Sequence, residues 1–475
     1  MLAAFRARTL SPVELLEAIV ERAGEVEPEV NAFAETMYEA ARAEAKIAEE
    51  RYLAGAQRPL EGLPLAAKEA QALEGHVTSE GLLEPLDTQP AQRTAFALQR
   101  LRDAGAIVHA RTTTSELCCM PMSHAVRWGV TRNPWDLTKA VGGSSGGSAA
   151  ALAAGTTILA TGSDIGGSIR APACLAGVVG YKAPYGRIPM EPPVAAESRM
   201  HHGPMARTVG DAALMFNVMA GPHADDPYSL PSVPELPLEL SEPAGMRIAF
   251  CLQPGDMPVA AEIVDRLAAL MTELDDGCLG IEAIELDWRL ADVNEAMWGH
   301  GDLGRAEAVL RGEEERPGAL SPYTKECLRR SLEMAAAVPP ERRATLERQI
   351  RGSVLSCFER FDALIVPAVG VVSMDAGEDY HERPLEVGDR ALDHFCDACL
   401  TPVFNIASCC PVLSVPAGFV PVEDRGAGAV GVPSAGGLPT GVQVVGPPHD
   451  DLTAFRVAAA IERRLPADRW RAVRG

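Results

Sequence analysis

Residues 142–170 of the chain read GGSSGGSAAALAAGTTILATGSDIGGSIR. Two glycine-serine clusters stand at the ends of this stretch, and glycine lets bare backbone N–H groups approach a ligand closely. The alanine-rich segment between them predicts a helix followed by the start of a strand. The stretch therefore indicates an α/β unit whose loops carry a ligand site.

Strand and helix patterns alternate on both sides of this stretch. Short apolar runs predict strands at 63–67, 106–110, 156–160, 246–251, 363–367, 412–415 and 441–445. Helical periodicity predicts helices near 94–104, 208–220, 259–274, 341–360 and 451–464. The alternation predicts an α/β protein with a large mixed, mostly parallel central sheet flanked by helices.

The ends and connections of the chain suggest one domain. Ser11 and Glu14 form a capping box with Pro12 in the first turn, and a second helical stretch follows at about 30–53, so residues 11–55 are predicted as N-terminal helices. The proline-rich stretch 221–243 is the best linker candidate, but the same alternation resumes after it. We expect a single domain over 1–475, with its core at 62–220, a less regular peripheral insertion at 287–340 and a surface loop at 424–437.

Composition limits the classes of partner. The 475 residues are 47% hydrophobic and 23% charged, as in packed soluble proteins. The net charge of −22 argues against a nucleic acid or an anionic membrane as the main partner. Eleven cysteines without a recognisable secretory leader predict reduced thiols in a cytoplasmic protein. The expected ligand is small.

The GGSSG motif at 142–146 permits more than one chemistry. It lacks the lysine of a phosphate-binding loop, which disfavours a nucleotide site. It fits the G-x-S-x-G elbow of α/β-hydrolases, which would make Ser144 a nucleophile paired with a later histidine, and it also fits a flexible loop. The later histidines, none of them in a distinctive context, are His201, His202, His223, His300, His381, His394 and His449.

Lys68 makes the chemistry more specific. It follows the apolar run 63–67, at the end of a predicted buried strand. Most such lysines extend their amine to water. A lysine that is buried without a close anion has a lowered pKa and can act as a base, and a shift from about 10.4 to near 7 requires roughly 4 to 5 kcal/mol.

With Lys68 included, the sequence resembles the amidase signature family. The family's glycine-serine block matches 142–155, its nucleophile block matches GSDIGGSIRAPA at 162–173, and its lysine block matches GLPLAAKEA at 62–70. Further family-like segments extend the resemblance over nearly the whole chain: TRNPWDLTKAVGG at 131–143, YKAPYGRIP at 181–189, GPMARTVGDAA at 203–213, NIASCCPVLSVPAGF at 405–419 and GLPTGVQVVG at 437–446.

The resemblance implies the amidase signature fold, with the catalytic core at 62–220, and serine chemistry without a cofactor. Ser168 would be the nucleophile, Ser144 a bridging serine held by a cis peptide bond, and Lys68 the base that starts the proton relay. The backbone donors of the oxyanion hole would be Ile165, Gly166, Gly167 and Ser168. The residues that would support these loops are Ser145, Asp164 and Arg170.

Three departures from the family pattern surround these positions. Glu69 stands where aspartate is usual, Arg111 replaces a usual lysine, and residues 71–87 replace a glycine-rich continuation. None of them changes a catalytic position. We therefore expect the substrate to differ more than the mechanism.

Cysteines supply two further candidate groups. The first group consists of His394, Cys396, Cys399, Cys409 and Cys410. A zinc site in this group is disfavoured because Cys409 and Cys410 are adjacent, which is poor spacing for metal ligands. No metal is expected. A second group either lines an acyl pocket or packs in the core: Cys118, Cys119, Met120 and Met122.

We expect an amidohydrolase that cleaves a small carboxamide through a Ser168 acyl-enzyme and releases ammonia or an amine. The alternatives are the amidase-type subunit of a transamidation complex, an acyl-transferring biosynthetic homologue, and a non-catalytic binding homologue. The expected partner is a small amide substrate, with a homodimer allowed. The sequence leaves open the acyl group, the leaving amine, the oligomeric state and the pathway.

Overall fold

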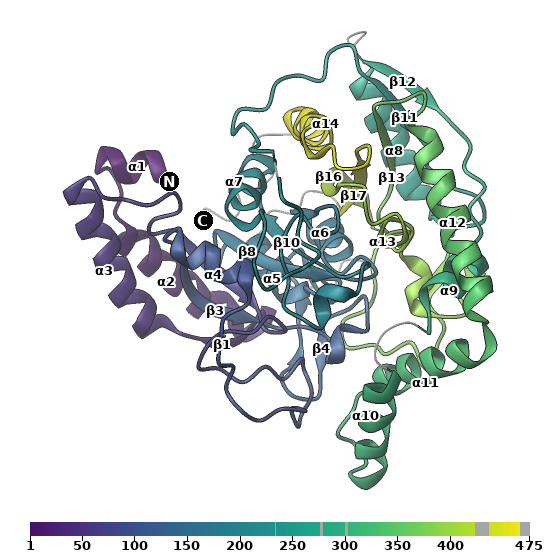
Figure 1. Ribbon diagram of the computed structural model, residues 1–475, viewed down its shortest axis with the longest axis horizontal. Coiled ribbons are helices and arrows are strands. Elements are labelled where there is room, and N and C mark those ends of the chain that lie inside the picture. Colours follow the sequence, from purple (N-terminus) through teal and green to yellow (C-terminus); the bar gives the residue numbers. More distant parts are fainter. Residues whose placement is uncertain (233, 276–278, 300–302, 423–436, 466–475) are drawn as a thin grey trace.

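The computed structural model describes residues 1–232, 234–275, 279–299, 303–422 and 437–465. An eleven-stranded sheet runs through the molecule (Figure 1). In spatial order its strands are β1 (Phe33–Thr36), β3 (Ile107–Thr112), β2 (Pro64–Lys68), β8 (Leu159–Asp164), β10 (His201–Ala206), β9 (Val179–Lys182), β16 (Val412–Pro421), β17 (Gly437–Val445), β13 (Ala363–Pro367), β11 (Arg247–Phe250) and β12 (Gly280–Ala283).

The sheet is mixed, as predicted, but it is not mostly parallel. Four strand pairings are parallel and six are antiparallel. The parallel pairs include β2 with β3 and β11 with β12, whose members are joined by a helix. Strands β10, β9, β16 and β17 pair antiparallel in the middle. Alternation of helix and strand patterns does not determine strand direction, which explains the error.

Helices cover the sheet and its ends. Their bounds are α1 (Leu2–Ala7), α2 (Pro12–Val30), α3 (Tyr38–Ala54), α4 (Phe96–Asp103), α5 (Gly146–Ala154), α6 (Arg170–Ala176), α7 (Val209–Met219), α8 (Ala261–Leu274), α9 (Leu290–Met297), α10 (Leu303–Glu315), α11 (Pro322–Ala337), α12 (Pro340–Cys357), α13 (Val403–Ile406) and α14 (Asp451–Arg464). Three short 3-10 helices are η1 (Glu116–Cys118), η2 (Val194–Ala196) and η3 (Phe395–Ala398).

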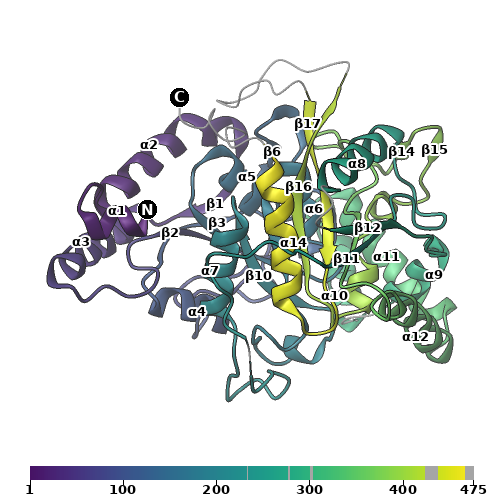
Figure 2. The same cartoon turned by 90° about the horizontal axis from the view of Figure 1, so that it is seen from above.

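Three two-stranded ribbons lie outside the main sheet. They are β4 (His124–Ala125) with β5 (Gly129–Val130), β6 (Arg132–Asn133) with β7 (Asp136–Ala140), and β14 (Glu386–Val387) with β15 (Arg390–Ala391). Figure 2 shows α14 lying along β16, against which it packs.

Alternate residues of the central strands face two separate apolar clusters. In β2, Leu65 and Ala67 contribute to one cluster and Ala66 to the other. The Ala66 cluster contains the alanines of α5, and the other contains the buried residues of α7 and α14. Both faces of the sheet are therefore covered, which explains why its strands read as continuous apolar runs.

The predicted N-terminal helices and the predicted peripheral segments agree with the structure to different degrees. The Ser11 capping box begins α2, as predicted. The second N-terminal helix begins later than predicted, because Val30 ends α2 and β1 intervenes before α3. The stretch 287–340, predicted as less regular, contains α9, α10 and α11, and Figure 1 shows α10 and α11 at the margin of the molecule. The predicted loop at 424–437 lies outside the described residues except for Gly437, where β17 begins.

The part of the chain described by the structure contains no helix that is both long and apolar enough to cross a membrane.

Candidate active site

The predicted base and the predicted nucleophile loop lie at one edge of the sheet. Strands β2, β3 and β8 are parallel, so their carboxyl ends meet there. Lys68 is the last residue of β2, and β8 ends at Asp164, just before the loop that carries Ser168. The loop before α5 supplies Ser144 to the same edge.

Lys68 is bonded to two serines. Its Nζ lies 2.7 Å from Ser144 Oγ and 2.9 Å from Ser163 Oγ, and the lysine is fully buried. Burial lowers the pKa of Lys68, although the neighbouring Cys118 thiol and the carboxylates of Asp164 and Glu80 oppose this shift. The amine therefore has a weakened preference for its charged form, as a proton acceptor requires.

Ser144 is held by close backbone packing. The Gly143–Ser144 peptide bond is cis, in agreement with what the family resemblance implies. A Cβ at position 143 would lie 2.5 Å from the Met122 carbonyl oxygen, so only glycine fits there. Ser144 is fully buried, and its Oγ is bonded to Lys68 rather than to a histidine, which disfavours the hydrolase-elbow alternative.

Ser145 joins the two serine-bearing loops. Its N–H donates to the Ser168 carbonyl oxygen at 3.1 Å. Its hydroxyl bonds the carbonyl and the N–H of Ser163, each at 3.3 Å. Ser144, which is the predicted bridging serine, the end of β8 and the predicted nucleophile loop are thus fixed relative to one another.

The loop 165–168 wraps around Asp164. The carboxylate accepts hydrogen bonds from the N–H groups of Gly167 at 2.9 Å and Ile169 at 3.2 Å. The Gly167 N–H is therefore occupied, which removes it from the predicted oxyanion donors. In the described structure no such bond occupies the N–H groups of Ile165, Gly166 or Ser168.

Glycine serves two different purposes in this loop. Gly166 faces open space, with nothing within 4 Å of an added Cβ. Gly167 has φ +116°, and an added Cβ would lie 1.8 Å from Thr401 Oγ1. Gly166 therefore leaves room for a ligand, whereas Gly167 is needed by the fold of the loop.

A buried ion pair anchors Asp164. Arg170 Nη2 lies 2.8 Å from Asp164 Oδ1, and both residues are fully buried. Although burial alone would raise the pKa of the Asp164 carboxyl, the Arg170 guanidinium and the amide of Asn405 hold it well below its usual range. Arg170 also donates to the Thr401 carbonyl oxygen at 2.9 Å and to Gln443 Oε1 at 2.7 Å.

Four residues of this network were not singled out from the sequence. They are Ser163, Thr401, Asn405 and Gln443. Three of them lie 231 to 273 positions after Arg170 or Asp164 along the chain. The family-like segments at 405–419 and 437–446 contain two of these residues, but nothing in one sequence indicates their contact with Arg170.

The departures from the family pattern contact each other. Arg111 Nη2 lies 3.9 Å from Glu69 Oε1 and donates to the Glu69 carbonyl oxygen at 2.6 Å. Glu69 accepts hydrogen bonds from the N–H groups of Ser79 and Glu80, at 2.6 and 3.0 Å. Arg111 also donates to the Val77 carbonyl oxygen at 2.7 Å. The two residues therefore hold the divergent segment 71–87 beside Lys68.

The sulfur-containing group at 118–122 divides between site and core. Met120 and Met122 are buried in the main apolar cluster. Cys118 and Cys119 are half-buried, and the Cys118 thiol lies beside the Lys68 amine. Only the cysteines of this group therefore retain the exposure needed to contact a ligand.

The predicted cysteine and histidine group is split up by the fold. Potential ligand atoms of His394 and Cys396 lie within 4.8 Å of Cys327, whereas this cluster includes neither Cys399 nor the pair Cys409 and Cys410. His394 Nδ1 accepts a hydrogen bond from the Cys396 N–H at 3.1 Å and caps η3. This ring nitrogen is thus already used in the local fold.

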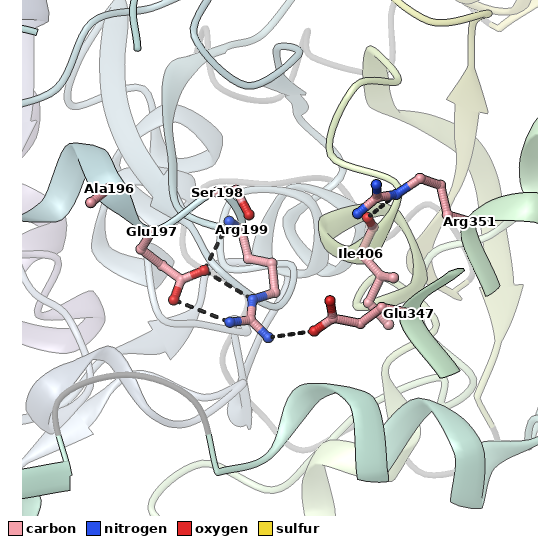
Figure 3. A pocket seen from close by; sticks show the side chains of 7 residues that line it. All are labelled: Ala196, Glu197, Ser198, Arg199, Glu347, Arg351 and Ile406. Carbon is pink, nitrogen blue, oxygen red and sulfur yellow. Dashed lines mark hydrogen bonds and ion pairs between the residues drawn. The ribbon is translucent and has the colours of Figure 1, made fainter. Parts of the chain in front are cut away.

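Figure 3 shows a polar pocket that includes residues next to η2 and residues of α12. It is lined by Ala196, Glu197, Ser198, Arg199, Glu347, Arg351 and Ile406, and ion pairs join Arg199 to both glutamates. The Arg199 carbonyl oxygen accepts a hydrogen bond from Asn405, which also binds Asp164. None of the predicted catalytic residues lines this pocket.

Comparison with known proteins gives the family. A family model described as Amidase matches residues 14–454. The chain belongs to the amidase family. Like other amidases, it is an enzyme that acts on carbon–nitrogen amide bonds.

Individual relatives cover nearly the whole amidase chain. One subunit of a glutamyl-tRNA(Gln) amidotransferase from Symbiobacterium thermophilum is 31% identical over 97% of this chain and 94% of its own. A putative amidase of Synechocystis is 30% identical over 98% of this chain and 88% of its own. A bacterial aryl acylamidase of the amidase signature family shares the fold, with a TM-score of 0.87 at 23% identity, over 100% of this chain and 97% of its own.

Proposed function

We propose that this amidase hydrolyses a small carboxamide through a Ser168 acyl-enzyme. The observation that carries the proposal is the fully buried Lys68 amine, 2.7 Å from Ser144 Oγ, on the loop bonded to Ser168 through Ser145. A lysine in this setting can be a base, and a serine next to it can pass a proton onward.

The acylation step moves one proton along the relay. Neutral Lys68 accepts the proton of Ser144 as Ser144 accepts that of Ser168, and Ser168 Oγ forms a bond to the amide carbonyl carbon. The tetrahedral intermediate then breaks its carbon–nitrogen bond, and the relay returns the proton to the leaving nitrogen. Ammonia or an amine departs, and the acyl group remains on Ser168.

Deacylation uses the same groups in reverse. A water molecule gives a proton to the relay as its oxygen attacks the acyl carbon, and Ser168 recovers the proton when the ester bond breaks. The products are a carboxylic acid and the regenerated hydroxyl. No cofactor is required by this sequence of steps.

Backbone donors would stabilise the negative oxygen in both steps. The candidates are the N–H groups of Ile165, Gly166 and Ser168, which are not engaged elsewhere in the described structure. The open space at Gly166 allows the substrate carbonyl to approach. Asp164 and Arg170 act on this loop indirectly, by fixing its backbone.

A second function is favoured by one relative. The amidotransferase subunit from Symbiobacterium thermophilum is 31% identical over nearly the full length of this chain. The same chemistry in a transamidation complex would release ammonia to a substrate held by a partner subunit. Co-purification with a second subunit, or activity that depends on one, would distinguish this role from free hydrolysis. A homodimer and a cytoplasmic location stay predictions.

The test is a panel of amides assayed for release of ammonia or amine. We expect wild-type turnover, essentially none with Ser168→Ala, and a slow residual rate with Ser144→Ala because water partly replaces the bridge. Ser356→Ala, which changes an exposed serine of α12, is the matched control and should behave like wild type.

Covalent labelling identifies the nucleophile directly. A fluorophosphonate probe should modify a peptide that contains residues 166–170, at Ser168. Labelling at Ser144 with Ser168 untouched would refute the proposed assignment and restore the hydrolase-elbow alternative. Absence of both turnover and labelling would instead support a non-catalytic homologue.

A further inference from the structure

One buried histidine beside the base has no role in the proposed relay. His202 is the second residue of β10, whose first residue, His201, pairs with Asp164 at the end of β8. It lies directly opposite Ser163 in the antiparallel pair of β10 and β8. Opposed residues of such a pair place their side chains on the same face, with Cβ atoms about 4.5 to 5.5 Å apart.

This register places His202 next to Ser163, which contacts the predicted base Lys68. Ser163 is one of the two serines bonded to Lys68, at 2.9 Å. Burial lowers the pKa of His202; the nearby Lys68 lowers it further, and Glu191 opposes the shift. The preceding residue, His201, lies opposite Asp164 and so faces the other side of the sheet.

His202 differs from the other buried histidines in its hydrogen bonding. His109, His124 and His394 each use a ring nitrogen in a bond, to Thr157, Asp379 and the Cys396 N–H respectively. His201 bonds to the backbone of Ala183. Within the described residues, the buried Nδ1 of His202 has no hydrogen-bond partner.

The missing hydrogen-bond partner of Nδ1 is unusual because only 8% of the surface of His202 is exposed. Polar atoms at such depth are almost always paired, and a buried N–H without an acceptor is rarer than an unpaired lone pair. The neutral ring therefore keeps its proton on Nε2. This leaves one N–H donor beside Lys68 and Ser163 for a bound molecule.

We infer that His202 is a substrate-binding residue that donates a hydrogen bond to an acceptor atom of the amide substrate, close to the scissile group. The inference rests on the proposed function of the same site. Because the ring is neutral and Glu191 is near, the acceptor is an uncharged oxygen, such as a second carbonyl, rather than a carboxylate. Substrates would be amides that carry a second carbonyl group.

Matched pairs of primary amides test this specificity. In each pair one member has a carbonyl at a given position of the acyl chain and the other has a methylene there, and the position is moved along the chain. Wild type should prefer the carbonyl member of one pair by about tenfold or more in kcat/KM, since a site built to donate a hydrogen bond rejects the analogue without an acceptor.

Three variants separate binding from structure. His202→Phe keeps a ring without a donor, and should reduce the preference for the carbonyl member about tenfold or more, mainly through KM, so that the two members of the pair are hydrolysed with similar kcat/KM. His202→Gln retains an N–H donor and should keep part of the preference. His109→Gln, at a buried histidine of β3 bonded to Thr157, is the matched control.

The outcomes distinguish this inference from the proposed function. Equal losses on both members of every pair, or no loss at all, would overturn the role of His202 while turnover and Ser168 labelling persist. A wild-type enzyme that shows no preference in any pair would overturn it as well. Failure of wild type to hydrolyse any amide and to accept the fluorophosphonate at Ser168 would instead refute the proposed function.

Discussion

Burial of Lys68 makes pH a direct probe of its role. Only the neutral amine accepts a proton, and burial lowers its pKa, so kcat/KM should rise with pH through that lowered pKa and level off above it. Lys68→Ala should remove this limb and reduce kcat/KM by about 10²- to 10⁴-fold. The measurement is kcat/KM against pH for wild type and variants.

Lys68→Arg separates charge from basicity at the same position. A guanidinium stays charged at all accessible pH values and cannot accept the Ser144 proton, so this variant should be as inactive as Lys68→Ala. Near wild-type activity of the arginine variant would show that positive charge is sufficient there. The relay through Ser144 and Ser168 would then be wrong.

Some residues of the candidate site could be predicted from the sequence, and others could not. The motifs around Lys68, Ser144 and Ser168 were visible, and Lys68 and Ser144 are indeed in contact. The occupied N–H of Gly167 depends on how the loop folds back on Asp164, which no motif encodes. Asn405 and Gln443 reach the site through tertiary structure alone, so their contacts with Asp164 and Arg170 could not be read from one sequence.

The position of the segment 71–87 beside Lys68 should depend on the planar guanidinium group of Arg111. Its guanidinium group donates hydrogen bonds to the carbonyl oxygens of Val77 and Glu69, at 2.7 and 2.6 Å. Arg111→Lys keeps the charge but cannot make both bonds, so we expect a loss of about 1 to 3 kcal/mol in the free energy of unfolding and faster proteolysis within 71–87. Thermal unfolding and mapped limited proteolysis would measure both effects.

Arg42→Lys provides the surface comparison for this change. Arg42 pairs with Glu17 and Glu39 on the exposed faces of α2 and α3, where an ion pair contributes little. Arg42→Lys should therefore leave the free energy of unfolding the same as that of wild type within the error of the measurement. If Arg111→Lys is equally neutral and the 71–87 segment stays protected, Arg111 does not hold that segment.

Elements with a strong local pattern were predicted well. The helix at 451–464 and the strand at 363–367 coincide with α14 and β13. Strand β10 was missed because its sequence, HHGPMA, includes glycine and proline and lacks β-branched residues. Its strand conformation comes from pairing with β8 and β9, which is a tertiary effect.

For the molecule as a whole, we expect activity to survive prolonged treatment with a chelator. The proposed mechanism uses serine, lysine and backbone donors, so no step needs a metal. The measurement is amide turnover after dialysis against a chelator, compared with a sample dialysed without one. Loss of activity that zinc restores would instead implicate the cluster of Cys327, His394 and Cys396.

The overall architecture was predictable in class and not in strand direction. Alternating patterns led to an α/β protein with one large mixed sheet, and the eleven strands do form a single sheet. The predominance of antiparallel pairs depends on the long connections that bring β16 and β17 back beside β9 and β13. No local sequence pattern indicates that these strands pair with strands that lie far away along the chain.

The bonds of Arg170 to Thr401 and Gln443 have a consequence for biosynthesis. A ribosome makes the chain from its N-terminus, and the segments that carry Lys68, Ser144 and Ser168 emerge long before these partners. The loop that holds Ser168 can acquire these contacts only after the segment that carries Gln443 has been translated. An unfinished chain therefore carries all three predicted catalytic side chains before the loop of Ser168 has its contacts with Thr401 and Gln443.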